Sequence, residues 1–329
     1  MKRWLLYLFL FFSTVALAIN PVMADDRIEV VSPPDMASVS GKLINIIYKV
    51  NDDDSLDTIR VTSDYDSAHI LPGPNATFNI RHSSLFLSEG ENRIRIEGLK
   101  GKKVVAEKVL TVFLRSILVE EYSRIPPGFK EYTFHTSNNE KDCSFCHAEE
   151  LSEDAKSQQD ETLPSCYTCH KRIVDYKFVH GPASVWACAT CHKENSEKIK
   201  NSVPNPEVMA CQMCHTEELA AWQSEKFGHG PTLAGKCAFC HNPHASDEEF
   251  FLNRTPSDLC GYCHQDKLTN PHVITGFSEK GHPMKLDSGK NGKRGISCAS
   301  CHNPHAANNV SLLKGFKKSK MEICRNCHI

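Results

Sequence analysis

One five-residue pattern occurs eight times in this chain and constrains its structure more than any other feature. The pattern is Cys-x-x-Cys-His, and the stretch from Cys237 to His241 is a typical copy. The eight copies use all 16 cysteines, so no cysteine is left for another role. The cysteines of the pattern are Cys143, Cys146, Cys166, Cys169, Cys188, Cys191, Cys211, Cys214, Cys237, Cys240, Cys260, Cys263, Cys298, Cys301, Cys324 and Cys327.

This spacing suits the covalent attachment of a c-type haem. Two thiols separated by two residues can each add to a vinyl group on one edge of the porphyrin. The histidine that follows is then held beneath the iron as its proximal ligand. The sequence therefore predicts eight covalently attached haem c groups, with the proximal ligands His147, His170, His192, His215, His241, His264, His302 and His328.

Zinc sites, redox dithiols and disulfides are the other uses of paired cysteines. Zinc pairs do not require a histidine directly after every second cysteine, and redox dithiols do not occur in sets of eight. Disulfides explain neither the fixed gap between the cysteines nor the histidines. The pattern favours haem over all three.

The first 24 residues have the features of a secretory signal peptide. Lys2 and Arg3 form a positive start, an apolar run extends from Trp4 to Leu17, and Val22-Met23-Ala24 offers a cleavage site. The alternative is an uncleaved anchor, but the run is short for a span of about 20 residues. We therefore expect an exported protein, in the periplasm or at the cell exterior, without a stable membrane span after cleavage.

The formal net charge of −2 gives no indication of nucleic-acid binding. The basic stretches at 290–294 and 314–320 are short. Solvated loops account for them, although either could also be a docking patch for an acidic partner.

Residues 25–115 contain no cysteine and predict an all-β domain. Apolar and polar residues alternate over about seven short segments, with turn residues between them, as in a β-sandwich. The segments from Pro34 to Leu43 and from Leu87 to Ile96 resemble motifs of bacterial immunoglobulin-like domains. Residues 116–131 follow as a predicted linker, because Pro126 and Pro127 exclude a helix there.

Residues 132–329 contain the eight motifs, which fall into four pairs. The first cysteines of a pair lie 23 residues apart in three pairs and 26 apart in the fourth, which indicates four structural repeats. About 25 residues for each haem are too few for an ordinary apolar core. We expect short helices and irregular loops packed around the haems.

A histidine precedes the first motif of each pair, and two motifs continue as Cys-His-Asn-Pro-His. In these features the region resembles the multihaem cytochromes with a doubled Cys-x-x-Cys-His motif, which are related to cytochromes c3. Members of that family bind closely packed haems through two histidines each. The resemblance implies the distal ligands His135, His180, His229, His244, His272, His282 and His305.

Two axial histidines on each iron predict an electron-transfer conduit rather than a substrate-converting enzyme. Its partners would be redox proteins that donate and accept electrons, and it could form a homo-oligomer, a filament or an outer-membrane conduit complex.

Seven spare histidines for eight irons leave one iron without a candidate ligand. His69 or His82 of the β domain, Met209 or Met284, or a histidine of a neighbouring subunit could complete it. An open haem would instead suggest a multihaem reductase acting on nitrite, hydroxylamine or a sulfur oxyanion. The nitrite and tetrathionate types commonly mark the active haem with a lysine, whereas all eight motifs here end in histidine.

Overall fold

The computed structural model describes residues 27–51, 56–70, 79–141, 165–193, 199–269, 296–315, 320–326 and 328. The predicted signal peptide and the first haem motif, Cys143 to His147, lie outside these ranges. So do Cys327, His272 and His282.

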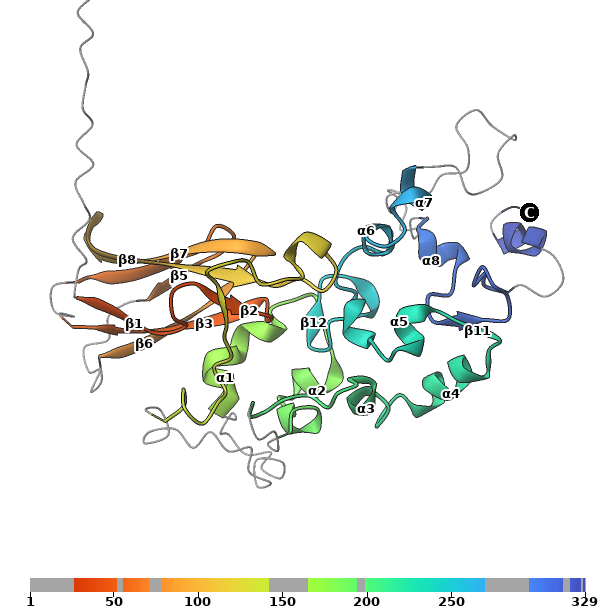
Figure 1. The fold of residues 1–329 in the computed structure, drawn as a ribbon, viewed down its shortest axis with the longest axis horizontal. Coiled ribbons are helices and arrows are strands. Elements are labelled where there is room, and N and C mark those ends of the chain that lie inside the picture. Colours follow the sequence, from red (N-terminus) through yellow and green to blue (C-terminus); the bar gives the residue numbers. More distant parts are fainter. Residues whose placement is uncertain are drawn as a thin grey trace, which may run out of the picture.

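The N-terminal part is a β-structure of two sheets, in agreement with the predicted all-β domain (Figure 1). One sheet has the order β1-β3-β6 and the other has the order β5-β4-β7-β8-β2-β9. The strands are β1 (Ile28–Ser32), β2 (Ala37–Val39), β3 (Leu43–Val50), β4 (Thr58–Thr62), β5 (Ser67–Ile70), β6 (Ile80–Phe86), β7 (Gly90–Lys100), β8 (Lys103–Leu114) and β9 (Lys130–Glu131).

Alternation along the strands builds one apolar core between these sheets. In β3 every second residue is buried, and Ile46, Tyr48 and Val50 are fully covered. The Tyr48 hydroxyl lies 3.1 Å from the Ser83 hydroxyl on β6, so this buried polar group is satisfied. The pattern of period two that predicted strands is therefore the pattern that fills the core.

The predicted linker contains regular structure. A short 3₁₀ helix, η2 (Glu120–Tyr122), follows β8, and β9 then pairs in parallel with β2. The chain thus returns to the edge of the six-stranded sheet before it leaves the sandwich.

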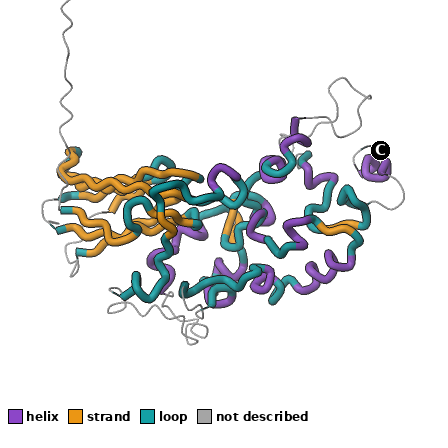
Figure 2. Tube along the Cα trace, in the orientation of Figure 1, coloured by secondary structure: helices purple, strands orange, loops and turns teal. Residues whose placement is uncertain are grey.

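Residues after 164 form short helices joined by turns and two-residue strands, as predicted (Figure 2). The elements are α1 (Ser165–His170), η4 (Lys171–Val174), β10 (Phe178–Val179), α2 (Gly181–Ser184), η5 (Cys188–Thr190), α3 (Val208–Cys211), α4 (Thr216–Ser224), β11 (Phe227–Gly228), α5 (Gly230–Leu233), η6 (Cys237–Phe239), β12 (Ala245–Ser246), η7 (Glu249–Phe251), α6 (Pro256–Gly261), α7 (Gln265–Thr269), α8 (Cys298–Cys301), β13 (Ala306–Ala307) and η8 (Lys320–Asn326).

This part of the chain buries few apolar side chains of its own. In the described residues after 164, the buried apolar residues are Ala210, Ala245, Leu259, Ala306 and Ala307. Four of the five are alanines, which offer little apolar surface, so the polypeptide supplies only a small fraction of an ordinary core here. No helix in the described ranges is long and apolar enough to cross a membrane.

Successive repeats interlock through two short ladders. β10 pairs with β12, and β11 pairs with β13, both antiparallel. Each ladder joins the residues before a His-Gly-Pro sequence to the residues after the Asn-Pro-His sequence of the next repeat. The repeats therefore cannot be positioned independently of one another.

The sandwich packs on the helical part through β6 and α1. The Ser84 hydroxyl donates to the Cys169 carbonyl oxygen at 2.8 Å. Arg172 donates to Asp66 at 2.6 Å and to the Ser84 carbonyl oxygen at 2.8 Å, and it lies over the Phe86 ring. These contacts fix the sandwich against the first described haem motif.

Candidate haem-binding sites

The predicted proximal and distal histidines meet in pairs. Five pairs lie within the described residues, with ring centroids 6.0–6.3 Å apart and interplanar angles of 5–31°. Each pair combines one motif histidine with one of the histidines that the family resemblance proposed as distal ligands. The pairs are His170 with His135, His215 with His180, His192 with His244, His264 with His229, and His241 with His305.

This separation fits one metal ion between the two rings. An imidazole nitrogen binds a first-row metal at about 2 Å. With the ring centre about 1 Å behind that nitrogen, two imidazoles on opposite sides of one metal place their centroids about 6 Å apart. The histidines of this chain are therefore arranged as a haem iron with two axial imidazoles requires.

The pairs follow a rule that the motif spacing did not reveal. A second-motif histidine pairs with the histidine that precedes its own repeat, as His215 does with His180. A first-motif histidine pairs with the Asn-Pro-His histidine of the next repeat, as His192 does with His244. The interlocking ladders produce this exchange, because they hold the Asn-Pro-His turn against the preceding repeat.

The first-motif histidines are oriented by backbone carbonyl groups. The Nδ1 atoms of His192, His241 and His302 lie 2.7 Å from the carbonyl oxygens of Asn201, Phe250 and Ser311. Since a carbonyl oxygen only accepts, each Nδ1 donates, and the lone pair is left on Nε2 for a metal.

The carbonyl groups that orient these rings belong to tight loops with left-handed backbone. Asn201 and Phe250 have φ of 57° and 60°, and Leu312, next to the third carbonyl, has φ of 51°. Such conformations are unfavourable for residues other than glycine and concentrate at functional sites. These conformations recur in the loops of three motifs, beside the carbonyl group that accepts from the histidine. The strained turns therefore help to position the imidazole.

Two of the distal histidines, His180 and His229, stand directly before short helices. His180 and His229 are the N-cap residues of α2 and α5, which begin with Gly-Pro. Proline is suited to the first turn of a helix because its φ is already helical. The His-Gly-Pro sequence therefore ends an extended segment and starts a helix at the ligand itself.

Burial keeps several of these imidazoles neutral. Burial, with a smaller contribution from neighbouring histidines, lowers the pKa of His170, His244 and His305 to about 4. A neutral imidazole is the form that binds a metal, so the lowered pKa is consistent with ligation.

One aromatic contact to a ligand was not anticipated from the sequence. The indole of Trp222, on α4, stacks on the His305 ring with centroids 3.9 Å apart and an interplanar angle of 18°. Trp222 lies outside every haem motif, so only the fold brings it there. The stack restricts rotation of the His305 ring.

Among the described residues, the thirteen cysteines form no disulfide bond with one another. The first cysteines of consecutive motifs in adjacent repeats lie within hydrogen-bond reach of each other: Cys166 with Cys188, Cys211 with Cys237, and Cys260 with Cys298. In the same described ranges, no three of His, Cys, Asp and Glu cluster as an ordinary metal-ion site would need. These thiol contacts bring the second motif of one repeat close to the first motif of the next.

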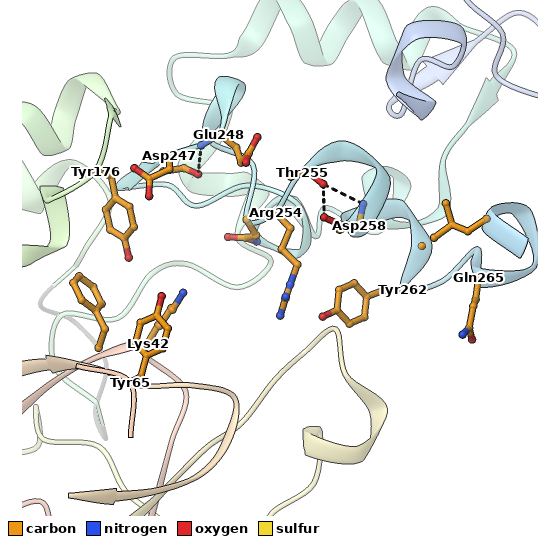
Figure 3. Close-up of a pocket in the computed structure, with 15 residues that line it drawn as sticks. Lys42, Tyr65, Tyr176, Asp247, Glu248, Arg254, Thr255, Asp258, Tyr262 and Gln265 are labelled. Atoms are coloured by element: carbon orange, nitrogen blue, oxygen red, sulfur yellow. Dashed lines mark hydrogen bonds between the residues drawn. The ribbon is translucent and has the colours of Figure 1, made fainter. Parts of the chain in front are cut away.

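A cleft of about 910 Å³ lies where the sandwich meets the third repeat (Figure 3). Tyr65 and Phe86 line it from the sandwich, and Tyr176 and Tyr262 line it from the helical part. Arg254 points into the same space, lies over the Tyr262 ring and pairs with Glu89 at 2.6 Å. The cleft borders the motif that begins at Cys260 and marks a second contact between the two parts.

Comparisons with known proteins agree with the motifs. Residues 229–269 and 290–329 match the family model for the doubled CXXCH motif. No curated protein matches the chain. Among solved structures, the chain is similar to the Clostridium thermocellum CbhA fibronectin(III)-like modules, at 11% identity over 26% of this chain and 94% of that chain, with a TM-score of 0.21. Residues 229–269 and 290–329 therefore carry the doubled CXXCH motif, and this match supports a multihaem c-type cytochrome.

Proposed function

We propose that this chain is an octahaem electron-transfer conduit that acts outside the cytoplasmic membrane. The observation that carries the proposal is the set of five histidine pairs with centroids 6.0–6.3 Å apart. Haem c supplies the one-electron chemistry of its iron when it is bound. At each of the five described pairs, the two imidazoles would hold one iron between them and would leave no position on it for a substrate.

Contacts between motifs support a path for electrons along the chain. The thiol contacts bring the end of one repeat to the start of the next. Within the interlocked pairs, the amide of His180 donates to the carbonyl oxygen of His244, and the amide of His229 donates to that of His305, both at 2.9 Å. On this basis the haems follow one another in sequence order from the first repeat to the fourth.

We assign the eighth axial ligand to His82 of the sandwich. Side chains alternate along β6, and Ser83 and Leu85 belong to the sandwich core. His82 therefore shares the outward face with Ser84 and Phe86, which contact Cys169 and Tyr176 of the helical part. The other sandwich histidine, His69, lies on β5 at the edge of the six-stranded sheet, and Met209, two residues before Cys211, is 48% exposed.

The proposed location and partners follow from the chemistry. Covalent haem attachment and the predicted signal peptide support export to the periplasm or the cell surface. The partners would be redox proteins that deliver and remove electrons. The sandwich would position the first repeat and serve as a docking module.

Haem content and spin state test the proposal directly. The purified protein is expected to carry eight haems by mass and by haemochrome absorbance. Optical and electron paramagnetic resonance (EPR) spectra should show only low-spin iron, and carbon monoxide should not bind the reduced protein. One high-spin haem that binds carbon monoxide would contradict the conduit and point to reductase activity at that haem.

A further inference from the structure

The ring of His135 has a different kind of hydrogen-bond partner from the rings of His180 and His229. Nδ1 of His180 lies 2.9 Å from the Pro243 carbonyl oxygen, and His229 is bonded to the backbone of Pro304 in the same way. Nδ1 of His135 instead lies 2.8 Å from Oε1 of Glu140. A carboxylate only accepts, so the His135 ring donates.

Glu140 is held firmly in this position. Its side chain is 2% exposed, and its second oxygen lies 2.6 Å from Nζ of Lys200. Both carboxylate oxygens of Glu140 are thus paired, one with Nδ1 of His135 and the other with Nζ of Lys200. The amide of Lys200 also donates to the His135 carbonyl oxygen at 2.9 Å, so one residue fixes both the backbone and the carboxylate.

The sequence explains why a carboxylate takes the place of a backbone carbonyl group as the acceptor for His135. In the second and third repeats the distal histidine is bonded to the Asn-Pro-His turn of the next repeat, His180 through Pro243 and His229 through Pro304. The second repeat has Asn195 where the third has His244, so it lacks that sequence. The first repeat uses its own carboxylate, five residues after the ligand, in place of a proline carbonyl group.

We infer that Glu140 is a positioning residue that orients the His135 imidazole and lowers the reduction potential of the iron held between His135 and His170. The inference rests on the proposed function, since it requires that this pair binds iron. A charged acceptor on Nδ1 makes the imidazole a stronger donor through Nε2 than a neutral carbonyl group does. A stronger donor stabilises the oxidised iron.

The position of this iron links its lowered reduction potential to the direction of electron flow. Its ligand His170 ends α1, which packs on the sandwich through β6. A lower potential here than at the irons of His215 and His264 favours electron flow from the sandwich end toward the later repeats. Glu140 would then give the conduit its direction.

The test is the substitution Glu140→Gln in the full haem-loaded chain, which removes the negative charge and keeps the shape of the side chain. Potentiometric titration followed by optical and EPR spectra should show one haem of eight shifted to higher potential, with all haems still low-spin. The matched control is Glu218→Gln, because Glu218 lies 3.8 Å from Nδ1 of another ligand, His215, but is 55% exposed. The control should leave every potential unchanged.

Two further variants keep the outcome decisive. Glu140→Asp retains the charge but withdraws it by one methylene, so it should raise the reduction potential of the same haem by less than Glu140→Gln does. If the Glu140→Gln protein loses haem, Glu140→Asp provides the test instead. His135→Ala should make one haem high-spin. The low-spin signal that disappears identifies the haem whose reduction potential Glu140→Gln is expected to raise.

The outcomes separate this inference from the proposed function. Unchanged potentials in a fully loaded Glu140→Gln protein, with His135→Ala high-spin, would overturn the role of Glu140 alone. If His135→Ala stays fully low-spin, the pairing of His135 with His170 on one iron is wrong, and the ligand assignment behind the proposed function fails with it.

Discussion

At the scale of single residues, each imidazole pair depends on one side chain from a different part of the chain. His192 follows its own cysteines, whereas its partner His244 comes from the next repeat. Motif histidines are therefore fixed by local sequence, and distal histidines are fixed by the packing of turns.

Replacing His244 by alanine should open one axial position. We expect one haem of eight to become high-spin and to bind carbon monoxide when reduced, with the other signals unchanged. His244→Met is the matched control, because a thioether keeps the iron low-spin while raising its potential. Optical and EPR spectra measure both effects, and a fully low-spin His244→Ala protein would exclude His244 as a ligand.

At the scale of the elements, β6 connects the sandwich to the haem motifs. His82, Ser84 and Phe86 share its outward face, and the last two contact the helical part. We predict that His82→Ala makes one haem high-spin, while His69→Ala leaves all haems low-spin. Carbon monoxide titration of the reduced proteins distinguishes them, and identical spectra for the two variants would refute the assignment of His82.

The ion pair between Asp66 and Arg172 joins the same elements and should depend on pH. Burial raises the pKa of Asp66, but hydrogen bonds from Arg172 and from backbone amides outweigh burial and hold this pKa below its ordinary value. A lowered carboxylate pKa stabilises the fold above the ordinary value and loses that contribution as the pH falls through the lowered one.

Asp66→Asn should therefore destabilise the protein at neutral pH by about 1–3 kcal/mol. The difference from the wild-type protein should shrink as the pH falls below about 4. Denaturant titrations at several pH values measure it. Glu107→Gln is the control, because it breaks a more exposed pair with Arg95 away from this contact. A difference that persists at low pH would show that the charge of Asp66 is not responsible.

At the scale of the whole molecule, the two parts reach stability by different means. The sandwich has a continuous apolar core that includes Ile46, Ile59, Val61 and Leu85. The described residues after 164 bury mainly alanines. Without haem, the second part has too little apolar burial to offset the conformational entropy of ordering the chain.

We therefore predict that protein made without haem attachment keeps a folded sandwich and an unfolded remainder. Limited proteolysis followed by mass spectrometry should leave a resistant fragment that contains β1 to β9 and degrade the region beyond it. The haem-loaded protein, treated in parallel, should resist cleavage in both parts. Equal resistance of the haem-free and haem-loaded chains would contradict the dependence on haem.

The sequence by itself determined the features that are local in the chain. Haem attachment follows from cysteines two residues apart and the adjacent histidine, and the alternation in residues such as Ile44, Ile46 and Tyr48 follows from the period of a strand. Both predictions needed only neighbouring residues.

The tertiary structure decided which distant residues meet. The pairing of His241 with His305, the stack of Trp222 on His305 and the use of Glu140 by His135 all depend on ladders and turns between repeats. The sequence around a histidine does not identify a partner that lies dozens of residues away, because the path of the backbone determines which ring each histidine faces. Only packing brings the two imidazoles to the separation at which one iron fits between them.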